Sequence, residues 1–175
     1  MARSTREEKA LGQLLVDEGL VRPHHLEEAF EAQRTTGKRL GTILTERGFV
    51  SEAELAATLA RQLEMPFFEL DEYIVDPAVC SLVPEHLCER YRLIPLMKTG
   101  DKLVIAFADP LNEDALADVK LLTGLAIKPV VATPSDVNRA LSAAFDALAL
   151  REELTDRVLR PPPSRPGRPH LRKVR

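Results

Sequence analysis

The sequence predicts an α+β protein, in which N-terminal tandem helical hairpins precede a small mixed α/β domain with a short sheet covered by helices. Two observations lead to this prediction. Residues 11–33 and 40–62 are two copies of one pattern, with matched residues 29 positions apart, as in a duplicated supersecondary unit. Residues 66–148 then alternate short apolar runs with helical patterns, and the connections between them are short.

Each copy of the repeat predicts a helical hairpin. In copy two (residues 40–62), a helical apolar pattern ends at Gly48, a residue type suited to a left-handed helix end. Ser51 and Glu54 then have the spacing of a capping box, which opens a second helix. Copy one (residues 11–33) has the same break at Gly19, and Pro23 is suited to the first turn of its second helix.

The second half of the chain predicts a mixed sheet. Asp76, Asn112 and Ser135 are expected to cap helices, Gly124 ends one, and Asp109-Pro110 is interpreted as a turn after a strand. The expected elements, in order, are a strand at 66–70, helices at 77–82 and 84–90, strands at 92–97 and 102–107 joined by a hairpin turn, a helix at 112–122, a strand at 125–132 and a helix at 135–148.

These patterns divide the chain into four segments. The predicted divisions are a disordered N-terminus at 1–9, the tandem-repeat helical module at 10–64, the α+β domain at 66–148, and a helix end followed by a disordered basic tail at 149–175. No acidic residue follows Asp156, and the tail is rich in proline and arginine, so it cannot bury a core. Either a solubilising end or a partner-binding arm fits this composition.

Several classes of protein are disfavoured by composition. The polar N-terminus lacks the apolar core of a signal peptide, and no run approaches the length of a membrane span, so a cytoplasmic protein without membrane insertion is expected. Two cysteines, Cys80 and Cys88, do not imply a disulfide framework. His24 and His25 are interpreted as a surface pair rather than metal ligands, because no second ligand pair has zinc spacing. We expect no catalytic constellation, no metal and no cofactor.

Two glutamines occupy the same position in both copies. Gln33 follows Leu26, and Gln62 follows Leu55, at a separation that puts both residues of each pair on one helix face. An amide on an apolar face supplies a paired donor and acceptor. The presence of this amide in both copies indicates a ligand that each copy contacts in the same way.

The link between the copies carries three cations. Arg34, Lys38 and Arg39 lie within six residues of an otherwise acidic body, and Arg39 leads directly into Leu40-Gly41 at a predicted helix start. Such a helix start with a nearby guanidinium favours an anion, phosphate above all. The alternative is a solvated loop beside a capped helix.

The repeated pattern Arg-Leu-Gly-x-x-φ-φ-x-x-Gly-φ-φ-x₄-Leu-x₃-Leu-x₂-Gln, with its five-residue spacer, resembles the cyclic di-GMP-binding N-terminal domain of MshE-type ATPases of type II secretion and type IV pilus assembly. The resemblance covers residues 10–148. It implies that arginine and glutamine contact guanine and phosphate, that glycines admit the ligand and that leucines line it. The implied contact residues are Leu11, Gly12, Leu15, Gly19, Leu26, Gln33, Arg39, Leu40, Gly41, Leu44, Gly48, Leu55, Leu59 and Gln62.

Two departures from the family pattern shape the functional hypothesis. Copy one has Ala10 where the motif has arginine, and the chain has no ATPase body, so a stand-alone protein is expected. The leading hypothesis is a non-catalytic cyclic di-GMP receptor that acts on a protein of a pilus, secretion or motility system. The alternative is an interaction adaptor, docked on such a component, with weakened or lost nucleotide binding. No nucleic-acid partner is expected, because residues 1–159 lack a basic face.

Overall fold

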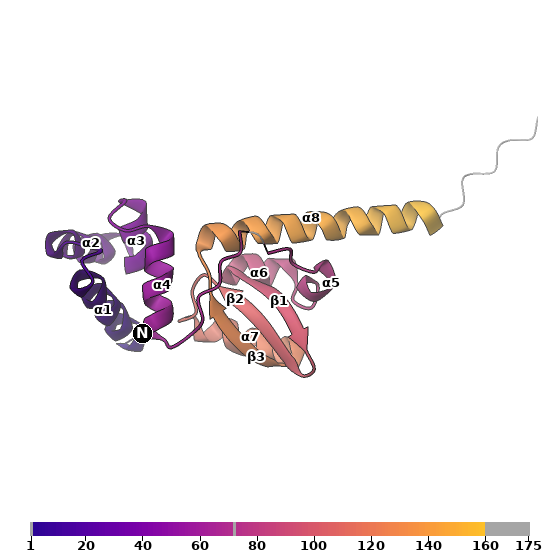
Figure 1. Cartoon of the computed structure of the whole chain (residues 1–175), viewed down its shortest axis with the longest axis horizontal. Helices are drawn as coiled ribbons and strands as arrows, with labels where there is room; N and C mark the ends of the chain where they lie inside the picture. Colours follow the sequence, from indigo (N-terminus) through magenta and orange to yellow (C-terminus); the bar gives the residue numbers. More distant parts are fainter. Residues whose placement is uncertain (1, 72, 160–175) are drawn as a thin grey trace, which may run out of the picture.

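The chain forms two modules joined side by side (Figure 1). The structure is a computed structural model that describes residues 2–71 and 73–159. The predicted disordered tail at 160–175 lies outside these residues. Each module has its own apolar core, one built from the helical repeat and one built around the sheet. The α+β fold class predicted from the sequence is confirmed.

The helical module contains four helices, namely α1 (Ala2–Asp17), α2 (Pro23–Thr36), α3 (Leu40–Glu46) and α4 (Glu52–Gln62). The expectation of a disordered segment at 1–9 is wrong for residues 2–9, which extend α1 toward the N-terminus. No proline or glycine interrupts that stretch. The Gln33 amide also donates to the Glu8 carboxylate at 2.9 Å, which ties the extension to α2.

The turn chemistry predicted for both hairpins is confirmed. Gly19 and Gly48 have φ of +73° and +68°, the left-handed region in which a glycine avoids steric strain. Pro23 begins α2 as its first residue. Before α4, the Ser51 hydroxyl accepts from the Glu54 N–H at 3.2 Å and the Glu54 carboxylate accepts from the Ser51 N–H at 3.0 Å, which completes the capping box.

The second module is a three-stranded sheet with helices around it. Strands β1 (Leu93–Thr99) and β2 (Lys102–Phe107) form an antiparallel hairpin, and β3 (Ala126–Val131) lies parallel to β2. The helix α7 (Glu113–Thr123) makes the crossover between β2 and β3. The helices α5 (Pro77–Cys80) and α6 (Glu85–Tyr91) both contact α8 (Pro134–Leu159), and all three contact β1.

Two expected elements differ from the structure. The strand expected at 66–70 is a single bridge between Phe67 and Val131, because the chain meets the β3 edge only there. The Phe68 N–H donates to the Val131 carbonyl and the Val131 N–H to the Pro66 carbonyl, both at 2.8 Å. The last helix begins at Pro134 and is capped by the Thr133 hydroxyl, not by Ser135.

The modules touch along α4. Ala56 and Ala60 of α4 form a small apolar cluster with Val131 of β3, and Phe67 packs against it. The Glu52 carboxylate accepts from the Ser135 N–H at 3.0 Å, which joins the start of α4 to the start of α8. Copy two of the repeat therefore faces the α+β domain.

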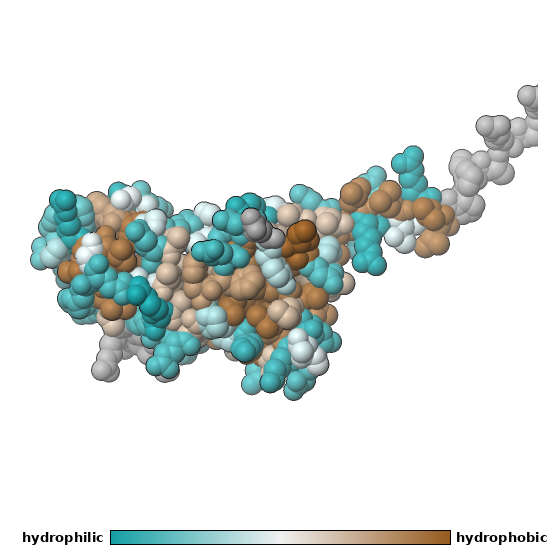
Figure 2. All heavy atoms as spheres, viewed as in Figure 1, coloured by the Kyte–Doolittle hydropathy of each residue, from teal (hydrophilic) through white to brown (hydrophobic). Residues whose placement is uncertain are grey.

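The far half of α8 extends beyond the body of the molecule (Figures 1 and 2). Leu150, Leu154 and Val158 follow one another at four-residue spacing and are exposed there. Within the described ranges, no helix has the length and apolar character that crossing a membrane requires.

Candidate ligand-binding cleft

A cavity of about 520 Å³ lies where copy two meets the α+β domain. This volume falls within the usual range for small-molecule sites, roughly 300–1,000 Å³. The helices α1, α3 and α4 form one wall, and α6 with the segment after β2 forms the other. The lining residues with charged or aromatic side chains are Glu8, Arg39, Glu46, Glu52, Arg90, Tyr91, Arg92 and Asp109.

Arg39 joins the two walls of the cleft. Its guanidinium forms an ion pair with the Asp109 carboxylate, across the module boundary. The Arg39 side chain is 46% exposed, so it is open to the cleft. Burial raises the pKa of the Asp109 carboxyl above its ordinary value, and the Arg39 guanidinium opposes that rise. Arg39 therefore stabilises the charged form of Asp109.

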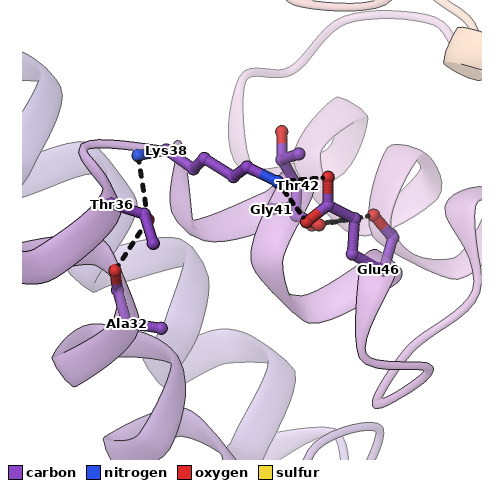
Figure 3. A network of polar contacts seen from close by, with 7 residues as sticks. Ala32, Thr36, Lys38, Gly41, Thr42 and Glu46 are labelled. Atoms are coloured by element: carbon purple, nitrogen blue, oxygen red, sulfur yellow. Dashed lines mark hydrogen bonds and ion pairs between the residues drawn. The ribbon is translucent and has the colours of Figure 1, made fainter.

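The spacer before α3 is held by its own polar contacts (Figure 3). The Lys38 ammonium donates to both carboxylate oxygens of Glu46, at 2.8 and 2.7 Å, across α3. The Thr36 hydroxyl donates to the Ala32 carbonyl at 2.7 Å and accepts from the Lys38 N–H at 3.3 Å. Of the three cations predicted to bind an anion, Lys38 is thus paired with Glu46 of copy two, and Arg34 pairs with Glu31 at 2.9 Å.

The structure brings five of the fourteen predicted contact residues together at the cleft. They are Leu11, Arg39, Gly41, Leu55 and Leu59. Three of the five come from copy two, and Arg39 directly precedes it. The symmetric arrangement expected from the repeat is therefore not seen in the lining of this cavity.

The remaining predicted contact residues lie outside the lining. Leu15, Leu40 and Leu44 are fully buried and belong to the apolar core of the helical module. Gly19 and Gly48 form the hairpin turns, and Gln33 and Gln62 are half-buried. Gly12 and Leu26 pack against each other between α1 and α2.

The motif glycines allow close contact between helices. A methyl group on Gly12 would lie 2.7 Å from Leu26 Cδ1, and one on Gly41 would lie 2.9 Å from Leu55 Cδ2. Both distances are shorter than van der Waals contact, and both are to the motif leucine of the following helix. The same glycine–leucine contact is thus built into both copies.

Sequence reasoning missed the wall supplied by the α+β domain. Asp109 was interpreted as a turn residue, and Arg90, Tyr91 and Arg92 were not considered as site residues. One signal was available, because Asp109 lies two residues after the buried end of β2, where a half-buried carboxylate needs a partner. Nothing in the periodicity identifies Arg39, in a segment some 70 positions earlier, as that partner.

The other candidates for chemistry are accounted for by packing. Cys80 and Cys88 are both fully buried and are free thiols. The His25 ring stacks on Phe49 with centroids 4.0 Å apart, and His24 contacts His25 edge-on. In the described part of the chain, no group of three or more side chains is arranged to hold a metal ion.

Comparison with known proteins identifies the family. The model of the MshEN domain matches residues 63–149. A solved structure described as MshE with cdg is 35% identical and has a TM-score of 0.68, over 77% of this chain and 97% of that chain. The chain belongs to the MshEN family. The N-terminal domain of XpsE, at 22% identity and a TM-score of 0.66 over 78% of this chain and 94% of that chain, has the same fold.

Curated relatives of this MshEN chain are type IV pilus assembly ATPases named PilB. The protein from Myxococcus xanthus is 36% identical over 135 residues, which is 77% of this chain and 24% of the ATPase. The protein from Thermus thermophilus is 37% identical over 167 residues, which is 94% of this chain and 18% of the ATPase. The chain thus spans less than a quarter of the length of these two ATPases. The family resemblance drawn from the repeated motif is confirmed.

Proposed function

We propose that this MshEN chain binds cyclic di-GMP in the cleft between copy two and the α+β domain and acts as a non-catalytic regulatory module. The observation that carries the proposal is the convergence of the motif residues Arg39, Gly41, Leu55 and Leu59 on one cavity. The 35% identity to MshE, solved with cdg, supports the same ligand class for this chain.

The walls of the cleft suit a purine dinucleotide. Leu55 and Leu59 supply apolar surface for a base, and Arg39 supplies a guanidinium that can make paired hydrogen bonds to a phosphate. Tyr91 adds an aromatic ring on the opposite wall. A cyclic dinucleotide offers both kinds of group, two flat bases and two phosphodiesters.

The position of Arg39 suggests how occupancy would be transmitted. Arg39 bridges the modules through Asp109, so a phosphate that binds Arg39 competes for the same guanidinium. Ligand binding would then alter the contact between the helical module and the α+β domain. Because the relatives are pilus assembly ATPases, we propose that the responding surface belongs to a pilus, secretion or motility component.

An adaptor without nucleotide binding is the second candidate. Ala10 is exposed and lies outside the lining of the cleft, so copy one offers no motif guanidinium there. In this alternative, Arg39 and Asp109 only hold the two modules together. The binding measurement below separates the two functions.

Calorimetric titration with cyclic di-GMP, GTP and cyclic di-AMP tests the proposal. We expect one-to-one binding of cyclic di-GMP and weaker binding of the other two nucleotides. A wrong base leaves donors and acceptors unpaired, at a loss of roughly 1–3 kcal/mol by analogy with base readout. Undetectable or equal binding of all three nucleotides at high micromolar concentration would favour the adaptor.

A further inference from the structure

Two arginines at the junction of α6 and β1 line the cleft opposite copy two. Arg90 lies in the last turn of α6, and Arg92 follows that helix directly before β1. The Arg92 carbonyl accepts from the Ala108 N–H at 3.0 Å, which extends the β1–β2 pairing by one residue. That bond places the Arg92 backbone beside the residue that precedes Asp109.

The charged side chains that line the cleft differ in their polar partners. Each lining carboxylate has a partner: Glu46 pairs with Lys38, Asp109 pairs with Arg39, Glu52 accepts from the Ser135 N–H and Glu8 accepts from the Gln33 amide. Among the described residues, neither Arg90 nor Arg92 forms an ion pair. The Arg90 guanidinium lies over the Tyr91 ring, 5.1 Å from its centroid, which leaves Arg92 as the less engaged cation.

The backbone of Arg92 is also unusual. Its φ of 48° and ψ of 60° put it in the left-handed region, where a side chain with a Cβ is disfavoured. Glycine would end α6 at lower conformational cost, as Gly124 does for α7. A non-glycine residue held in this conformation at a cleft is grounds for a functional hypothesis.

We propose that Arg92 contacts a phosphate of the bound dinucleotide and supplies, from the α+β domain, the second guanidinium that copy one lacks. The inference rests on the proposed cyclic di-GMP binding. Arg39 then reaches the ligand from one wall of the cleft and Arg92 from the other. The ligand bridges the two modules, and the site is composite rather than a product of the repeat alone.

The test compares three variants by calorimetry with cyclic di-GMP. Arg92→Asn removes the charge and keeps a residue that tolerates the left-handed region, so its melting temperature is expected to stay at or above that of the parent. Arg92→Lys keeps the charge without the fork of donors. Arg151→Ala is the control, because Arg151 lies on the far half of α8 and outside the cleft.

We expect Arg92→Asn to bind cyclic di-GMP about tenfold more weakly than the parent, which corresponds to the loss of one charge-assisted contact. The affinity of Arg92→Lys is expected to lie between those of Arg92→Asn and the parent. The affinity of Arg92→Asn should also depend less on salt. Arg151→Ala is expected to bind as the parent does. If the parent binds and the affinity of Arg92→Asn stays within twofold of the parent's, the role of Arg92 is refuted while the proposed function stands. The same conclusion follows if Arg92→Asn and the control Arg151→Ala weaken binding equally. If the parent does not bind, the proposed function fails first.

Discussion

Substitution of Arg39 by alanine separates a ligand contact from a contact between modules. A charge-assisted hydrogen bond contributes about 1.5–3 kcal/mol. In the free protein the guanidinium already pairs with Asp109, and an ion pair of that exposure contributes about 0–1 kcal/mol. The net loss of binding free energy on Arg39→Ala is therefore about 0.5–3 kcal/mol, or roughly two- to 150-fold in affinity for cyclic di-GMP, measured by calorimetry.

The same substitution has a predictable effect on stability. Loss of the ion pair leaves the half-buried Asp109 carboxylate without its guanidinium, which is expected to lower the melting temperature by about 2–4 °C for each kcal/mol lost. The pKa of Asp109 is already raised by burial, and removal of Arg39 raises it further. When the pKa of a carboxyl is raised in the folded state, the folded protein loses stability as pH rises through that pKa. The difference in melting temperature between the parent and Arg39→Ala should therefore become smaller as pH is lowered from 7 toward 4, as followed by thermal melts.

Two further variants make the prediction refutable. Arg47, at the other end of α3, is similarly exposed at 43% and pairs with Glu28 at 3.4 Å, so Arg47→Ala is the matched control and should bind normally. The double variant Arg39→Ala/Asp109→Asn also removes the carboxylate that lost its partner. Its melting temperature should recover, and its affinity for cyclic di-GMP should not. If affinity recovered as well, Arg39 would act only by neutralising Asp109, and the assigned phosphate contact would be wrong.

Three other outcomes are expected. Gly41→Ala should destabilise the protein by about 1–2 kcal/mol in chemical denaturation, because its methyl group would overlap Leu55 at 2.9 Å, and adding Leu55→Val should recover part of the loss. The thiols of the native protein should resist Ellman's reagent at pH 8 and react in denaturant, since burial raises the pKa of Cys80 to about 11 and that of Cys88 further. Ser51→Ala should lower the free energy of unfolding by about 0.5–2 kcal/mol through loss of the capping box, with unchanged nucleotide affinity in the same titration.

Local chemistry made much of the fold predictable. The breaks at Gly19 and Gly48, the capping box at Ser51 and the hairpin turn before β2 each depend on a few neighbouring residues, and all are present. The strand expected at 66–70 is reduced to a single bridge, for a reason that lies outside local chemistry. Its residues have suitable propensity, but strand length depends on how much of the β3 edge is available, which no local pattern records.

The lining of the cleft was the larger difference, because it draws more on copy two than on copy one. Ala56 and Ala60 in copy two pack against β3, and their counterparts 29 positions earlier are Glu27 and Glu31, which are exposed. Small apolar residues permit close packing, whereas two carboxylates keep the matching face of copy one in solvent. The sequence therefore did contain a signal of which copy meets the second module. Comparison of the residues that differ between the copies would have revealed it.

Ala10→Arg tests whether the symmetry of the repeat or the composite cleft governs binding. If the two copies were equivalent half-sites, the restored guanidinium would tighten binding five- to thirtyfold, or about 1–2 kcal/mol. Position 10 instead lies within α1, is exposed and does not line the cleft, although the adjacent Leu11 does. We expect the affinity of Ala10→Arg for cyclic di-GMP to change by less than about threefold in calorimetry. The reason is that Arg92, on the opposite wall, already supplies the second cation to the ligand. The fold should be unaffected, since arginine is a good helix former. Tightening beyond fivefold, in a variant that melts like the parent, would show that copy one does reach the ligand and would contradict the composite cleft.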